Sequence, residues 1–109
     1  MNLQEIINKL ALLPLTDIEE REITGVYISD MLSDVMSSAN AGNLWLTVQT
    51  HKNIVSAANL IDISAVVVTY GKKVPQETIE LANRFHVNIL STPLSTFDLV
   101  AQLINAGVK

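Results

Sequence analysis

The sequence alternates four times between a short apolar run and an amphipathic run. The apolar runs are rich in β-branched and aliphatic side chains, which favour buried strands. They cover residues 23–29, 44–49, 64–70 and 87–91. The runs that follow have helical periodicity and cover residues 30–38, 51–61, 75–85 and 95–107. Because alternating strands and helices form parallel sheets covered by helices, the sequence predicts an α/β fold with a mainly parallel, four-stranded sheet.

The four predicted strand-to-helix turns have a nearly constant spacing. They lie near Ser29, Thr50, Tyr70 and Ser91, at intervals of 21, 20 and 21 residues. Residue identities do not recur, so the spacing reflects the length of one compact βα unit. In a parallel sheet the carboxyl ends of the strands lie along one edge, where α/β folds bind their ligands. Polar side chains at these turns are therefore candidate binding residues.

The chain begins with a further predicted helix. Apolar residues recur at helical spacing between Leu3 and Leu10, and Asn2 is suited to cap this helix. Pro14 ends the region, and residues 15–22 are expected to form a polar connection or a turn of helix. At the other end, Ser95 is the expected cap of the last helix and Gly107 its C-terminal cap.

Composition predicts one domain, residues 1–109, that associates with itself. Apolar residues make up 49% of the chain and charged residues 17%, against roughly 25% charged in an average soluble domain. So much apolar side chain is difficult to bury in a small monomer, so we expect a homodimer. Ser56, Ala57 and Ala58 are small enough for close helix approach, which places the expected interface between Trp45 and Leu60.

Charge and cysteine content exclude several classes of function. The net charge is −4 and the seven basic residues are scattered, which gives no footprint for nucleic acid or a membrane surface. The chain has no cysteine, so disulfides and zinc–thiolate sites are excluded. Its apolar runs are too short to span a membrane, and its first residues lack the basic start of a signal peptide. We therefore expect a cytoplasmic protein.

The first turn carries Ser29 and Asp30, with Ser33 and Asp34 one helical turn further on. Capping preference alone explains these residue types, with Ser29 or Asp30 as the cap and the other two on a solvated face. The alternative is a polar, acidic wall of a binding site that faces the second turn.

The second turn is less ordinary, because it contains Gln49, Thr50, His51, Lys52 and Asn53 in succession. Cations are disfavoured in the first turn of a helix, yet His51 and Lys52 are predicted there. Basic residues at a helix N-terminus are suited to hold an anion, and the neutral side chains would orient it. The alternative is that His51 bonds an acidic residue of the first turn.

The third and fourth turns contribute Thr69, Ser91 and Thr92, which are as well explained as turn residues or caps. His86 precedes the last strand and is predicted on the surface at the opposite edge. The four glycines are too dispersed for a phosphate loop, and no residues have metal-ligand or nucleophile spacing. We therefore predict no catalytic residue, no metal and no cofactor.

These residues give the chain a resemblance to the DRTGG domain family. The similar segments cover nearly the whole chain, at residues 21–36, 44–60, 65–82 and 87–103. The most specific are Ser-Asp-Met-Leu-Ser-Asp-Val-Met at 29–36 and Gln-Thr-His-Lys-Asn-Ile at 49–54. In the segment that names the family, Glu20, Arg21, Thr24 and Gly25 fit, whereas Val26 replaces a second glycine.

The resemblance implies a regulatory or ligand-sensing module, similar to the N-terminal domain of HPr kinase/phosphorylase and to domains found beside CBS domains. With the alternation of elements, it predicts a three-layer α/β/α sandwich. The leading hypothesis is a non-catalytic domain that binds an anionic small molecule, such as a nucleotide or phosphometabolite. The alternative is a protein–protein interaction module, and an enzyme that uses His51 as acid or base ranks last.

Overall fold

The computed structural model describes residues 1–108, which form five helices and five strands. The helices are α1 (Leu3–Leu10), α2 (Leu32–Ser38), α3 (Asn53–Ile61), α4 (Gln76–Phe85) and α5 (Thr96–Asn105). The strands are β1 (Leu13–Pro14), β2 (Gly25–Ile28), β3 (Asn43–Thr47), β4 (Ala65–Val68) and β5 (Ile89–Ser91). No helix in this part of the chain is long and apolar enough to cross a membrane.

The sheet has five strands in the order β1-β5-β4-β3-β2, so the prediction of four strands was wrong by one. Strands β2 to β5 are parallel, as predicted, and β1 pairs antiparallel with β5. β1 has only two residues, too few to produce a periodicity, and one of them is Pro14. Proline is tolerated on an edge strand because its missing N–H can face solvent.

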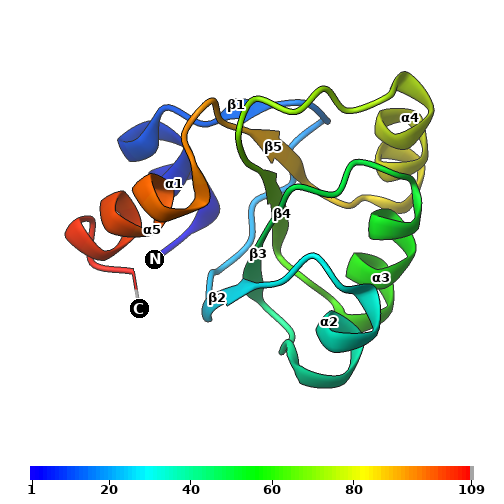
Figure 1. The fold of residues 1–109 in the computed structure, drawn as a ribbon, viewed down its shortest axis with the longest axis horizontal. Helices are drawn as coiled ribbons and strands as arrows, with labels where there is room; N and C mark the ends of the chain where they lie inside the picture. The colour runs from blue at the N-terminus through cyan, green and yellow to red at the C-terminus, as the bar shows by residue number, and fades with distance from the viewer. Residues whose placement is uncertain (109) are drawn as a thin grey trace.

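Helices cover both faces of the sheet (Figure 1), with α2, α3 and α4 on one face and α1 and α5 on the other. Strands β2 to β5 are neighbours in chain order, so every right-handed crossover runs in the same direction. This repeated direction places the three crossover helices on the same face. The predicted α/β fold, with helices around a mostly parallel sheet, is confirmed.

Alternation along the strands produces two separate hydrophobic cores. In β3, Leu44 and Leu46 pack with α1 and α5, whereas Trp45 packs with α2, α3 and α4. In β4, Val67 belongs to the first core and Val66 to the second. All five side chains are fully buried, because both faces of the sheet are covered.

The helices α1 and α5 begin where the sequence predicts, because each has a polar residue as its N-terminal cap. Asn2 caps α1 in a capping box, and Ser95 Oγ accepts a hydrogen bond from Asp98 N at 3.0 Å at the start of α5. α5 ends at Asn105 and its C-terminal cap is Ala106. The next residue, Gly107, has a φ of +94°. Left-handed backbone at this position is favourable for glycine, and the predicted end of the helix is correct to one residue.

Candidate functional site

The carboxyl ends of β2, β3, β4 and β5 lie along one edge of the sheet, since these four strands are parallel neighbours. The loops that follow them contain the polar residues predicted as a binding site. Five of the ten predicted binding residues have side chains that are hydrogen-bonded within the protein: Asp30, Asp34, Gln49, Thr69 and Thr92.

Asp30 connects the loop after β2 to the end of β3. Its Oδ1 accepts hydrogen bonds from Thr47 Oγ1 at 2.8 Å and from Val48 N at 2.9 Å. Its backbone oxygen accepts a third bond from Gln49 Nε2 at 3.1 Å. Because these bonds occupy Asp30 and Gln49, both residues hold the two loops in place.

The predicted capping of α2 by Ser29 or Asp30 is wrong. Its N-terminal cap is Met31, which makes no side-chain capping bond. Ser29 Oγ instead accepts a hydrogen bond from Met31 N at 3.2 Å, and Ser29 O accepts one from Trp45 Nε1 at 2.8 Å. Ser29 thus completes the turn and satisfies the buried indole, whose only polar atom needs a partner.

Asp34, on α2, is hydrogen-bonded to a side chain of β2. Tyr27 Oη donates a hydrogen bond to Asp34 Oδ2 at 2.8 Å. This bond, with smaller contributions from burial and charge, raises the pKa of Tyr27 above 10.0, because losing the proton would leave two anions in contact. Ser33 is exposed on α2. The predicted acidic wall therefore consists of two engaged carboxylates, Asp30 and Asp34, the engaged hydroxyl of Ser29 and the exposed hydroxyl of Ser33.

Thr69 and Thr92 are buried and hydrogen-bonded within the protein. Thr69 Oγ1 lies 2.9 Å from Thr96 Oγ1, and Thr92 Oγ1 accepts a bond from Leu94 N at 3.2 Å. Ser91 is the last residue of β5 and pairs with β1. The side chains of Thr69 and Thr92 therefore organise the loops after β4 and β5.

His51, Lys52 and Asn53 lie together in the second turn, and the side chains of all three are exposed. Within residues 1–108, none of their side chains takes part in a hydrogen bond or an ion pair, so the alternative pairing of His51 with an acidic residue is not formed. α3 begins at Asn53, two residues later than predicted, and His51 and Lys52 form the turn before it. Its capping residue, Lys52, makes no side-chain capping bond.

Thr50 lies beside this turn and anchors it to α4. Thr50 O accepts a hydrogen bond of 2.9 Å from Thr78 Oγ1, whose residue is fully buried. The side chains of His51 and Asn53 are therefore free on a backbone that is fixed. Of the ten predicted binding residues, these two and Ser33 remain exposed with unengaged side chains.

Tyr70 marks the predicted third turn but was not among the predicted binding residues. Its φ is +62°, as is that of Gly71, and its side chain is 54% exposed. Backbone bonds from Tyr70 N to Leu94 O (2.8 Å) and from Gly71 N to Thr92 O (2.9 Å) hold this turn. Left-handed backbone is rare for an aromatic residue, and the Tyr-Gly pair was the available signal.

The interface predicted between Trp45 and Leu60 is wrong for its strand half. Trp45 is fully buried inside the chain, and Ala57 and Ala58 pack against the chain's own core. The exposed residues of this helix are Leu60, at 70% exposure, Ser56, Asn53 and Asn59. His86 is exposed at the opposite edge, as predicted, with Nδ1 3.4 Å from Glu19 Oε2.

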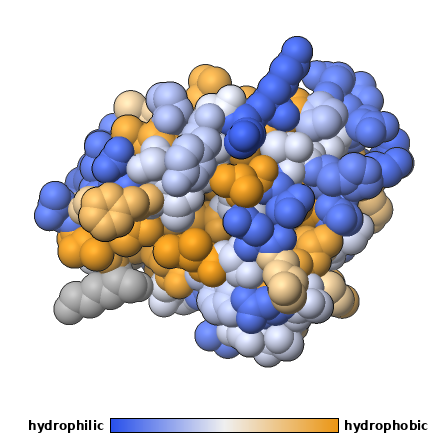
Figure 2. Space-filling view, in the orientation of Figure 1, coloured by the Kyte–Doolittle hydropathy of each residue, from blue (hydrophilic) through white to orange (hydrophobic). Residues whose placement is uncertain are grey.

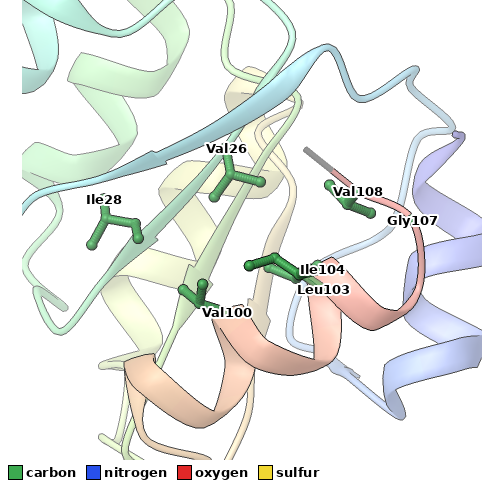
Figure 3. A pocket seen from close by; sticks show the side chains of 7 residues that line it. All are labelled: Val26, Ile28, Val100, Leu103, Ile104, Gly107 and Val108. Atoms are coloured by element: carbon green, nitrogen blue, oxygen red, sulfur yellow. The ribbon is translucent and has the colours of Figure 1, made fainter.

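A separate apolar groove lies beside β2, and the last residue of that strand, Ile28, is part of its lining. This groove of about 470 Å³ runs between β2 and α5, and its lining is apolar (Figure 3). Residues 1–108 contain no group of three or more histidine, aspartate or glutamate side chains placed to hold a metal ion.

The fold is similar to a crystal structure of the CBS and DRTGG domains of the regulatory region of Clostridium perfringens pyrophosphatase, complexed with its activator, diadenosine tetraphosphate. The TM-score is 0.71 and the sequence identity is 18%. The match covers 94% of this chain and 45% of that chain, so this chain spans less than half of that regulatory region. At this identity the likeness concerns the fold. Comparison with curated proteins found no match.

The sequence also matches the DRTGG domain over residues 11–106. This match covers most of the chain and includes the segments that carried the resemblance, at the edge and in the core. The chain belongs to the DRTGG domain family.

Proposed function

We propose that this chain is a non-catalytic regulatory domain that binds an anionic small molecule, a nucleotide or a phosphometabolite, at the N-terminus of α3. The observation that carries the proposal is the turn of His51, Lys52 and Asn53, whose side chains are exposed and have no hydrogen-bond or ion-pair partner within residues 1–108. A helix N-terminus offers backbone N–H groups and a partial positive charge to an anion. Lys52 adds a full charge there, and His51 and Asn53 add hydrogen-bond donors.

Because the net charge of the chain is −4, an anion needs a local attraction of this kind in order to bind. The anion is repelled by most of the surface and gains from a site where basic groups meet helix amides. The pyrophosphatase regulatory region that shares this fold is complexed with a nucleotide. That ligand belongs to the other protein, and here it suggests which compounds to test first.

The test is isothermal calorimetry with adenine nucleotides, diadenosine tetraphosphate and inorganic phosphate. We expect binding of at least one compound, and a loss of about tenfold or more in affinity for His51→Ala combined with Lys52→Ala. His86→Ala is the matched control, because this histidine is equally exposed at the opposite edge. Equal affinity in all three proteins, or no binding by the wild type, would overturn the proposal.

A second candidate is a protein interaction module, favoured by a different surface. Leu60 on α3 and Phe85 on α4 are 70% and 48% exposed, and they line a hollow of about 330 Å³. Exposed apolar side chains that gather in one place commonly mark protein contacts. Leu60→Ser and Phe85→Ser should abolish recovery of a defined partner, while the His51→Ala variant retains it. Retention by both surface variants would exclude this hollow as the contact.

A further inference from the structure

The two edges of the sheet are protected very differently. At one edge, β1 has two residues, one of which is Pro14. At the other, β2 has four residues, Gly25 to Ile28, without a charge or a proline, and it pairs only with β3. Soluble monomers usually block a free edge with charge, proline, a bulge or a covering segment. β2 contains neither a charged residue nor a proline, and no strand pairs with its outer edge.

An apolar groove lies directly beside this open edge. Val26 and Ile28 project from β2 towards α5, and Val100 and Ile104 project from α5 towards β2 (Figure 3). The groove also includes Leu103, Gly107 and Val108 in its lining. Ile28 is 50% exposed and Ile104 is 64% exposed. Both side chains are therefore open to solvent at the margin of the first core.

A second apolar stripe on α5 extends the same surface. Phe97, Val100 and Ile104 recur at helical spacing, while Leu99 and Leu103 face the core. Phe97 is 80% exposed, the highest value among the large exposed apolar side chains. The space-filling view shows apolar surface gathered over α5 and the adjoining region towards β2 (Figure 2). Buried and exposed stripes together make α5 apolar on most of its circumference, which is typical of a helix covered on both sides.

We infer that a second copy of this chain docks on the β2 edge, with the two β2 strands antiparallel across a two-fold axis and the exposed stripe of α5 packed into the contact. Backbone hydrogen bonds between the two strands would satisfy the open edge. Apolar side chains that protrude beside the groove on one copy would fill the groove of the other. A two-fold contact uses the same surface on both copies, so it requires a surface that complements itself.

Charge identifies a second copy as the suitable occupant. Two chains of net charge −4 repel each other unless their contact surface is uncharged. No charged residue occurs in β2 or among the described residues that line the groove, and α5 carries only Asp98. Within residues 1–108, the groove therefore offers no partner charge to a basic or acidic peptide.

The protection of the opposite edge makes the assembly stop at two copies. An antiparallel pair of β2 strands uses both open edges, and the remaining outer strands are the two short β1 strands with Pro14. These strands cannot readily add another chain. A standard interface covers about 800 Å² per partner, roughly one seventh of the 5665 Å² surface of this chain. The expected product is a closed dimer.

The test is light scattering across a dilution series, with Ile28→Lys, Ile104→Glu and the matched control Leu13→Lys on the opposite edge strand, β1. Each substitution places a charge at a side chain that is at least half exposed, so the folded monomer tolerates it. We expect a wild-type dimer, monomers for the two groove variants and a dimer for the control. Circular dichroism confirms that the variants are folded.

Hydrogen exchange separates strand pairing from packing of the groove alone. In the wild type, amide exchange in residues 25–28 should slow as protein concentration rises, and in Ile28→Lys it should not depend on concentration. A monomeric wild type at tens of micromolar, a dimer that survives both groove variants, or concentration-independent exchange in β2 would each overturn the inference. The His51→Ala variant should remain dimeric, so failure of the ligand proposal and failure of this one are distinguishable.

Discussion

Substitution of Asp30 tests whether this residue is structural, as its contacts indicate, rather than a ligand-binding residue. Both of its side-chain hydrogen bonds end on one oxygen, Oδ1, which accepts from Thr47 Oγ1 and Val48 N. Asp30→Asn keeps an acceptor oxygen at that place and removes the charge. Asp30→Ala removes the acceptor altogether. The two variants should therefore form a graded series in stability.

The magnitude follows from the two bonds. A hydrogen bond to a charged group contributes about 1.5–3 kcal/mol net, and the low end applies because Asp30 is exposed. After allowance for water that replaces the lost acceptor, Asp30→Ala should lower the free energy of unfolding by roughly 2 kcal/mol. Charge-assisted bonds are roughly twice as strong as neutral ones, so Asp30→Asn should cost about 1 kcal/mol.

Urea denaturation followed by the fluorescence of Trp45 measures these changes. Trp45 is the only tryptophan and is fully buried, so unfolding exposes it to water. For 109 residues, a loss of 2 kcal/mol corresponds to a fall in melting temperature of about 9 °C. Asp17→Ala is the control, since its carboxylate makes no hydrogen bond or ion pair within residues 1–108. If Asp30→Ala were no less stable than Asp17→Ala, the structural role of Asp30 would be refuted.

Three further predictions concern backbone strain and proton binding. Gly42→Ala should cost roughly 2 kcal/mol or more, because φ is +84° and the added Cβ would lie 2.7 Å from Thr24 atoms. Gly107→Ala, with a φ of +94° and open space, should cost about 1 kcal/mol in the same denaturation assay; equal losses would refute the clash. Ala11→Gly should raise the melting temperature by about 2–4 °C, because Ala11 has a φ of +52°; a lower temperature would contradict this. The pKa of Tyr27 is raised in the folded state, so its contribution to stability is present below pH 10.0 and is lost as the pH rises through the higher folded value. Tyr27→Phe should remove that part of the alkaline loss of stability, and an unchanged pH profile would count against it.

The sequence predicted the elements well because their signals are local. The first helix was expected between Leu3 and Leu10 and occupies those residues, since its apolar spacing and its Asn2 cap agree. The parallel strands were found for the same reason. β1 was missed because a pair of residues with a proline has no period, and only the neighbouring β5 makes it a strand.

The candidate site was predicted less well because its hydrogen bonds join segments that are distant in sequence. Asp30 reaches Thr47 because β2 and β3 are neighbours in register, with Ile28 beside Leu46. Strand order was not predicted, so this contact could not be foreseen. The polar residue types predicted an edge with many hydrogen bonds. The register of the strands determines that most of these bonds form within the protein.

The order of the strands also limits how a ligand can bind at this edge. In α/β sheets, ligands usually occupy the crevice where the strand order reverses and helices diverge to opposite faces. The helices that follow β2, β3 and β4 lie on the same face, so no crevice of that kind opens beside α3, and the chain crosses to the opposite face only with α5, after β5. The free groups of His51, Lys52 and Asn53 therefore form an exposed site at one helix end. Charge in such a site is screened by salt over about 10 Å, so binding there depends on ionic strength and on direct contact. Apolar association at β2 is not weakened by salt in this way, which gives the two proposed surfaces opposite responses to ionic strength.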